Sequence, residues 1–140
     1  MRAAPLLAGA LALALSAGAA TAATLDAATV YGNAEGCAAM KSGDLGAADF
    51  LVLTTETLQT QQYSCDFVQV LPAKSGDLFV NAICHGEGQA TPQTYAITED
   101  SGSIIIATTD QEFVAPGNGN VKACAGVTAE DAKKVLGSRQ

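Results

Sequence analysis

Residues 63–85 read "YSCDFVQVLPAKSGDLFVNAICH", and this stretch decides the fold. It holds two runs rich in β-branched and aromatic residues, 63–71 and 78–85, a composition typical of β-strands. Between them lies "PAKSGD", in which Pro72 and Gly76 are typical of a turn. The stretch therefore predicts an antiparallel hairpin.

The register of this hairpin follows from its turn. If Leu71 lies opposite Leu78, the same alignment places Cys65 opposite Cys84. Side chains alternate between the two faces of a strand, so His85 falls on the face opposite to the cysteines. The cysteine face, which we expect to be the core, is interrupted by Gln69 and contains Cys65, Phe67, Leu71, Leu78, Val80, Ala82 and Cys84.

The chain has four cysteines at wide spacings and no C-x-x-C pair, which favours two disulfides over a metal site. The hairpin register pairs Cys65 with Cys84, and Cys37 and Cys124 then join the two ends of the sheet. The second bridge closes a loop of roughly ninety residues and should stabilise the fold by about 4 kcal/mol. If residues 117–120 turn a full hairpin, the alternative pairing is Cys37 with Cys65 and Cys84 with Cys124.

Further strands are predicted on both sides of the hairpin. "DFLVLT" at 49–54 is an apolar, β-branched run, and a Thr/Gln-rich stretch at 55–62 leads from it to the hairpin. "QTYAITEDSGSIIIATTD" at 93–110 predicts two strands joined by a tight turn at 100–102. "QEFVAPGNGNVKAC" at 111–124 predicts either a short hairpin or one strand interrupted by a loop, with "NG" as the turn signal.

One helix is predicted at residues 128–136, where Thr128 caps the N-terminus, Asp131 takes the capping-box position and Gly137 ends the helix. A shorter helical turn is expected at residues 33–41, which contain the first cysteine. Together these elements predict a mainly β domain of five to seven antiparallel strands with two disulfides. We expect a small meander barrel or sandwich with a short helix near each end.

Residues 1–22 have the organisation of a secretory signal peptide. Arg2 precedes an apolar run at 6–15, and "ATA", which ends at Ala22, is a cleavage signal. The mature chain is then a single domain, 23–140, in the periplasm or outside the cell. No second hydrophobic segment follows, so we expect no integral membrane segment in the mature chain.

The mature chain is acidic. Removal of residues 1–22 takes away one of the seven Lys/Arg and none of the fourteen Asp/Glu, which leaves a net charge of −8. So negative a domain repels nucleic acid and attracts basic proteins. The sequence also lacks a phosphate-binding glycine loop and a basic stripe, so we expect no nucleic-acid partner and consider a basic protein as partner.

"NAICH" at 81–85 contains the only histidine. It resembles the C-x-x-C-H haem motif, but Asn81 stands where the first cysteine should be, and nothing in the sequence links Met40 to His85 as a second axial ligand. Structural zinc needs four ligands at short spacings, which are missing. We therefore predict no cofactor and no metal site, and we interpret His85 as a strand-end residue.

No set of catalytic residues stands out. With the cysteines oxidised, a serine or threonine nucleophile would depend on His85, and no G-x-S-x-G elbow occurs. The Asp and Glu residues lie mainly in turns and in the C-terminal helix, where solvation or capping explains them. "GEG" at 86–88 is interpreted as a turn whose glycines adopt positive φ. We predict no catalytic residue and expect that the protein is not an enzyme.

The segments "YSCDFVQVL", "VNAICHGEG" and "VKACAG" together resemble a known layout. It is similar to that of small exported four-cysteine proteins of alphaproteobacteria, in which a C-x-G-E-G stretch follows one strand and a late cysteine closes the domain. The similarity covers about residues 37–124, with His85 at the variable position of C-x-G-E-G. The resemblance implies a small β domain and assigns no activity.

The preferred hypothesis for function is a noncatalytic exported binding domain, inhibitor-like toward a basic protein such as a lysozyme or a protease. The alternatives are a small-ligand carrier with an open barrel mouth and an enzyme of unknown class. The partner and the oligomeric state are left open by the sequence.

Overall fold

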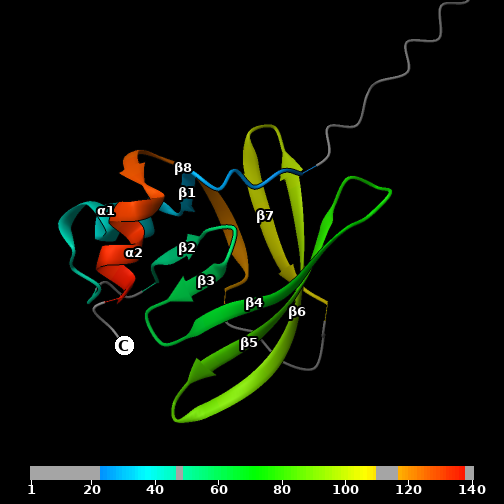
Figure 1. Cartoon of the computed structure of the whole chain (residues 1–140). Coiled ribbons are helices and arrows are strands. Elements are labelled where there is room, and N and C mark those ends of the chain that lie inside the picture. Colours follow the sequence, from blue (N-terminus) through cyan, green and yellow to red (C-terminus); the bar gives the residue numbers. More distant parts are fainter. Residues whose placement is uncertain (1–22, 47–48, 110–116, 138–140) are drawn as a thin grey trace, which may run out of the picture.

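A computed structural model of the protein describes residues 23–46, 49–109 and 117–137. The predicted signal peptide, residues 1–22, lies outside the described residues. Eight antiparallel strands form a closed barrel, in which each strand pairs with the next along the chain and β8 pairs with β1 (Figure 1). The elements, in chain order, are β1 (Thr29–Gly32), α1 (Ala34–Ser42), β2 (Leu51–Leu53), β3 (Thr57–Thr60), β4 (Ser64–Pro72), β5 (Leu78–Gly86), β6 (Gln89–Asp100), β7 (Ser103–Thr108), β8 (Gly119–Thr128) and α2 (Ala129–Gly137).

The predicted mainly β meander with a helix near each end is confirmed, and it is a barrel rather than a sandwich. It has eight strands instead of five to seven. The two strands that the sequence pattern missed are β1 and β3, each of only four residues. An alternation of period two is hard to recognise in so few residues, and the central Leu58 and Gln59 of β3 are both buried. Within the described residues, no helix is long and apolar enough to cross a membrane.

The hairpin of β4 and β5 has the predicted register only at the cysteine end, where the two cysteines lie opposite each other. A bulge at Val68 shifts the pairing by one residue beyond that point, so Leu71 pairs with Phe79 and not with Leu78. Leu71 is 45% exposed on the outer face of the barrel. The prediction that it belongs to the core is wrong, because a bulge reverses the inside–outside alternation of the residues that follow it.

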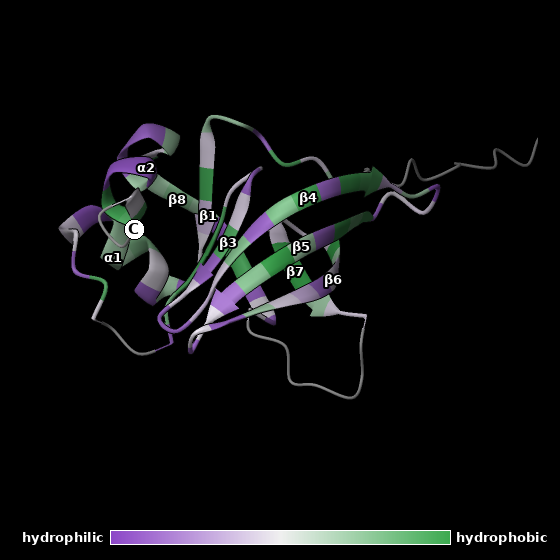
Figure 2. Ribbon diagram, turned by 60° about the horizontal axis from the view of Figure 1, so that its bottom comes forward, coloured by the Kyte–Doolittle hydropathy of each residue, from purple (hydrophilic) through white to green (hydrophobic). Residues whose placement is uncertain are grey.

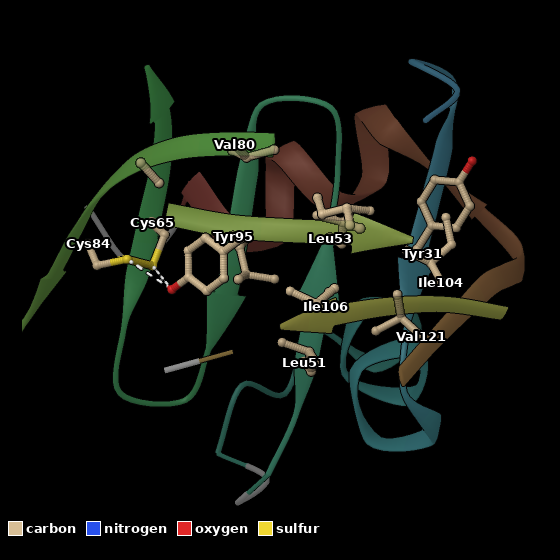
Figure 3. Packing of buried hydrophobic residues seen from close by; sticks show 13 residues of the cluster. Tyr31, Leu51, Leu53, Cys65, Val80, Cys84, Tyr95, Ile104, Ile106 and Val121 are labelled. Atoms are coloured by element: carbon tan, nitrogen blue, oxygen red, sulfur yellow. Dashed lines mark hydrogen bonds between the residues drawn. A yellow bond between two sulfur atoms is a disulfide. The ribbon is translucent and has the colours of Figure 1, made fainter. Parts of the chain in front are cut away.

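The inside of the barrel is filled with side chains. Tyr95 of β6 is fully buried there, and its hydroxyl points at the disulfide of Cys65 and Cys84 (Figure 3). The other buried members of this cluster are Tyr31, Leu51, Leu53, Leu58, Val80, Ala82, Ile97, Ile104, Ile106 and Val121. Removal of these apolar side chains from water is the main source of stability of the barrel.

A second apolar cluster lies outside the barrel, between its wall and the two helices. Its buried members are Val30, Ala39, Met40, Phe50, Val52, Cys124, Val127 and Ala132. The helices contact β1, β2 and β8, as Figure 1 shows on the left of the molecule. Because the outer face of these strands is covered, β2 is buried at every residue and does not alternate.

Asn33 and Gly36 fix the position of α1. The Asn33 side chain caps the helix by accepting a hydrogen bond of 2.7 Å from the backbone N–H of Gly36. Gly36 in turn lies so close to β2 that a Cβ at this position would overlap the carbonyl of Leu51. The helical turn predicted at 33–41 is thus confirmed as a full helix, and it is fastened to β8 by a disulfide.

Both predicted disulfides are formed. Cys37 of α1 pairs with Cys124 of β8 at a Cα–Cα distance of 5.3 Å. Cys65 and Cys84 join β4 to β5 at a Cα–Cα distance of 3.8 Å. The alternative, in which Cys84 pairs with Cys124, is therefore wrong. Two structural disulfides are typical of a protein that folds in an oxidising compartment.

Two tight turns have the predicted positions. Between β6 and β7, Ser101 and Gly102 both have positive φ, of 51° and 81°. Between β5 and β6 the residues with positive φ are Glu87 (52°) and Gly88 (76°). Gly86, which was expected to adopt positive φ, instead ends β5.

The C-terminal helix begins with the predicted capping box. Thr128 Oγ1 accepts from the backbone N–H of Asp131 at 3.1 Å, and the Asp131 carboxylate accepts from the backbone N–H of Thr128 at 3.1 Å. Gly137 is the last helical residue, one position beyond the predicted end. Of the segment 111–124, residues 117–124 contain the first part of β8, and residues 110–116 lie outside the described residues.

Candidate functional site

The two helices leave one half of the barrel without a covering layer. In the described part of the chain, neither helix packs on β4, β5, β6 or β7. The outer surface of these four strands, hereafter the bare face, is therefore formed directly by strand side chains. Figure 2 shows hydrophobic residues along β4 and β5, on the side of the molecule away from both helices.

An apolar row crosses the bare face. Leu71 pairs with Phe79, Phe79 with Ala96 and Ala96 with Ala107, so their side chains lie side by side on β4, β5, β6 and β7. Phe79 is 40% exposed, whereas the other Phe and Tyr residues in the described part of the chain are buried or partly buried. The bulged Val68 adds a further exposed side chain, at 69%.

A row of polar side chains lies next to the apolar row. The Asn81 amide donates to Gln69 Oε1 at 3.3 Å, and the Thr94 hydroxyl donates to Asn81 Oδ1 at 2.9 Å. These bonds run across β4, β5 and β6 in register. They link the exposed polar side chains of three neighbouring strands.

The part of the barrel that carries the bare face, residues 64–108 and hereafter the bare half, is negatively charged. Residues 64–108 contain five Asp/Glu and one lysine, Lys74, which gives a net charge of −4 with histidine neutral. One of the carboxylates, Asp77, is held by hydrogen bonds from the hydroxyls of Ser75 (2.7 Å) and Thr98 (2.9 Å). These bonds favour the ionised form and lower the pKa of Asp77 below its ordinary value.

A groove of about 790 Å³ lies at one end of the bare face, between α2 and the outer side of β3, β4 and β5. We call it the α2 groove. Its strand side is polar and includes Gln59, Ser64, Asp66 and His85, whereas its helix side includes the apolar Leu136. The groove thus brings the C-terminal helix next to the hairpin that carries the only histidine.

One histidine–carboxylate contact and one ion pair border the α2 groove. His85 Nε2 lies 3.9 Å from Asp66 Oδ2, and Lys133 Nζ lies 3.6 Å from Glu56 Oε2. All four side chains are more than half exposed. Such exposed pairs contribute at most about 1 kcal/mol each, which is too little to hold the groove closed against a ligand.

The floor of the groove is built from hydrogen-bonded side chains. Gln59 is 7% exposed, and its amide donates to Ser64 Oγ at 2.7 Å. The ring of Tyr63 packs on Gly86 so closely that a Cβ at this glycine would overlap the ring. These contacts fix the positions of a hydroxyl and an aromatic ring at the groove surface.

His85 and the two residues weighed with it in the sequence, Cys84 and Met40, lie in different surroundings. His85 is the penultimate residue of β5, as the strand-end interpretation predicted, and it also lines the α2 groove. Cys84 is in a disulfide, and Met40 of α1 is 3% exposed in the cluster between the helices and the barrel wall. Among the described residues, no three His, Cys, Asp or Glu side chains come close enough together to hold a metal ion.

Sequence reasoning missed both surfaces. The apolar row was hidden because the predicted register placed Leu71 inside the barrel. The proximity of Asp66 to His85 had a signal in the sequence, since the correct alignment of Cys65 with Cys84 also places Asp66 and His85 on the same outer face. The contribution of α2 to the groove had none, because it depends on how a distant helix packs.

No protein-family model, no curated protein and no solved structure matches this chain.

Proposed function

We propose that the protein is a noncatalytic exported binding domain, and that its bare face docks on a cationic protein, in the manner of an inhibitor of a lysozyme or protease. The observation that carries this proposal is the exposed apolar row of Leu71 and Phe79, with the exposed Val68 nearby on β4. Exposed aromatic and aliphatic side chains on a rigid surface are typical anchors of protein interfaces.

Charge supports a cationic partner. The bare half carries a net charge of −4, and Asp77 next to the row is held in its ionised form by two hydroxyls. A partner with lysines or arginines around an apolar patch would be attracted at long range and would then bury the row. A second copy of this chain is disfavoured as the occupant, since two chains of net charge −7 repel each other.

The rigidity of the bare face also favours binding. Its backbone is paired across four consecutive strands, the β4–β5 hairpin is cross-linked by a disulfide, and the polar row is hydrogen bonded. A surface that is already ordered loses little entropy on association. The disulfides and the predicted signal peptide support export to the periplasm or the medium.

The alternative of a small-ligand carrier requires a hollow barrel. Here Tyr95 and the branched side chains around it occupy the interior (Figure 3). The hollows at the α2 groove and on the β5–β6 face are lined by outward-facing residues such as His85 and Asn81. The filled interior therefore supports a binding function on the outer surface.

The test measures binding of the oxidised chain 23–140 to a panel of basic lysozymes and basic proteases by calorimetry at low and high salt. We expect an affinity that falls as salt rises. Leu71→Ser and Phe79→Ser should each weaken it by about tenfold or more, because each removes an apolar anchor. Polylysine, which offers charge without an apolar patch, should bind both variants as it binds the parent.

The control variant is Val135→Ser on α2, a partly exposed aliphatic residue away from the bare face. It should bind the partner with unchanged affinity. Salt-sensitive binding to no member of the panel would overturn the proposal. So would an equal loss in the control and in the two bare-face variants.

A further inference from the structure

We propose that the α2 groove is a binding site for a neutral saccharide, distinct from the apolar row of Leu71 and Phe79 on which the partner protein docks. The groove has the size of sites that hold small molecules, which range from about 300 to 1,000 Å³. It is formed by two rigid parts, the barrel wall and a helix anchored by Ala132, which is 1% exposed. The site therefore exists before a ligand arrives.

The hydrogen-bonding groups of the groove match adjacent hydroxyls. Ser64 pairs with His85 across β4 and β5, and Asp66 follows on the same face of β4. Asp66 offers only acceptors, whereas the imidazole of neutral His85 offers one donor and one acceptor. Ser64 Oγ already accepts a bond from Gln59, so its own proton is available to a ligand. Neighbouring hydroxyls of a sugar, each both donor and acceptor, suit this alternation.

Apolar surface faces these polar groups. Ala129 and Leu136 line the helix side, and the Tyr63 ring lies at the end near Gly86. Sugar rings have apolar C–H faces, which pack on aliphatic and aromatic side chains. The groove thus offers hydrogen-bonding groups and an aromatic ring on the strand side and aliphatic groups beside Lys133 on the helix side, a combination that suits an amphipathic polyhydroxyl ring.

Charge separates a saccharide from other polar ligands. With histidine counted as neutral, as above, the groove carries two carboxylates, Glu56 and Asp66, and one lysine, Lys133, which lies 3.6 Å from Glu56. An anionic ligand is repelled by this set, and a cationic ligand gains little from so small an excess of negative charge. An extended peptide is disfavoured as well, because β3 is hydrogen bonded on both sides within the barrel and has no free edge to pair with it.

The experiment is an NMR titration of the ¹⁵N-labelled, oxidised chain 23–140 with two neutral probes, tri-N-acetylchitotriose and maltotriose. Amide shifts should change at Ser64, Asp66, His85 and Ala132 and saturate. A stronger response to the first probe would indicate an amino sugar of cell-wall type, and a stronger response to the second a glucan. Saturable shifts in the groove with either probe support the site.

Asp66→Asn and Ser64→Ala should each weaken binding by about tenfold, the effect of losing one hydrogen bond to or from a polar ligand. Glu35→Gln on α1 is the control, since it removes a carboxylate outside the groove, and its affinity should be unchanged. No saturable shift with either probe would overturn the inference, as would tighter binding of tri-galacturonate than of the neutral sugars. Because no partner protein is present, failure here leaves the proposal for the bare face standing.

Discussion

The hydroxyl of Tyr95 lies 3.4 Å from Sγ of Cys84 and 3.6 Å from Sγ of Cys65, inside the barrel. A disulfide sulfur carries no proton, so the phenol is the donor to both sulfurs. The ring is fully buried, and burial raises the pKa of Tyr95 to about 12. The largest fully buried side chain is therefore hydrogen bonded to the disulfide that closes the shorter loop.

Tyr95 should limit stability at alkaline pH. Its pKa is about 12 in the folded chain against an ordinary value of 10.0, so its contribution is fully present below pH 10 and is lost as pH rises toward 12. Tyr95→Phe cannot ionise, and its stability should decline less over this interval. At neutral pH it should differ from the parent by about 1 kcal/mol or less, the value of one hydrogen bond. Urea unfolding of the parent and the variant between neutral pH and pH 12 measures the difference at neutral pH and the decline at alkaline pH. Parallel declines would show that ionisation of Tyr95 does not cause the loss of stability.

Gly36→Ala should destabilise the protein, although the same change in an exposed helix usually stabilises it by up to about 1 kcal/mol. The added Cβ would overlap the carbonyl of Leu51 and push α1 away from β2. We expect a loss of about 2 kcal/mol or more, as for other overpacked sites. Gly137→Ala, where a Cβ meets nothing within 4 Å, is the matched control and should leave the thermal midpoint the same or slightly higher.

The Asp77 carboxylate should stabilise the fold above about pH 4. Hydrogen bonds from Ser75 and Thr98 lower its pKa below 3.8, so its contribution is present above that value and is lost as pH falls through the lower, folded pKa. Asp77→Asn should therefore be less stable than the parent near neutral pH and equally stable in strong acid. A double-mutant cycle with Thr98→Val should show non-additive losses in urea midpoints. Additive losses would show that the two side chains act independently.

The two disulfides should differ in their effect on stability. Cys37–Cys124 spans a sequence separation of 87 and Cys65–Cys84 one of 19, for which chain entropy predicts about 4.5 and about 3 kcal/mol. Replacement of both cysteines of one disulfide by serine or alanine, followed by urea unfolding, measures the contribution of that disulfide. Replacement of Cys65 and Cys84 also leaves a gap in the core and should cost more than entropy alone. Peptide mapping without reduction should recover only these two linked pairs.

Truncation after Gly126 should lower the thermal midpoint without abolishing folding. The removed residues, among them Val127 and Ala132, belong to the cluster outside the barrel, and none of them is a member of the interior cluster. The truncated chain should keep both disulfides and the β-sheet circular dichroism signal. A chain that no longer folds would show that the outer cluster is required for barrel closure.

The sequence predicts those parts of the fold that depend on neighbours in the chain. The Cys65–Cys84 pair follows from folding one hairpin about its turn, and the capping box of Thr128 and Asp131 lies within four residues. The bulge at Val68 does not follow, because the whole ring of strands decides where a wall must bend. That single residue determines whether Leu71 is core or surface.

The candidate site was less predictable than the fold, because it combines residues that lie far apart in the sequence. His85 was recognised as unusual, but it was not paired with Asp66, which lies on the same outer face of the same hairpin. The α2 groove also needs Lys133 and Leu136, which come from a helix almost fifty residues further along the chain. Its packing on the barrel depends on the outer cluster, which no local pattern specifies.

The unequal lengths of the strand ladders imply an order in which the barrel opens. The β5–β6 ladder runs without interruption from Leu78 to Gly86, whereas β7 and β8 are paired only from Ile104 to Ile106. The β1–β2 ladder is shorter still, but α1 and the outer cluster cover it. Fluctuations that break the ring should therefore start at the β7–β8 seam, and amide protons there should exchange with deuterium long before those of β5. Phe79 lies on β5, so a partner that buries this ring would dock on the part of the molecule that opens last.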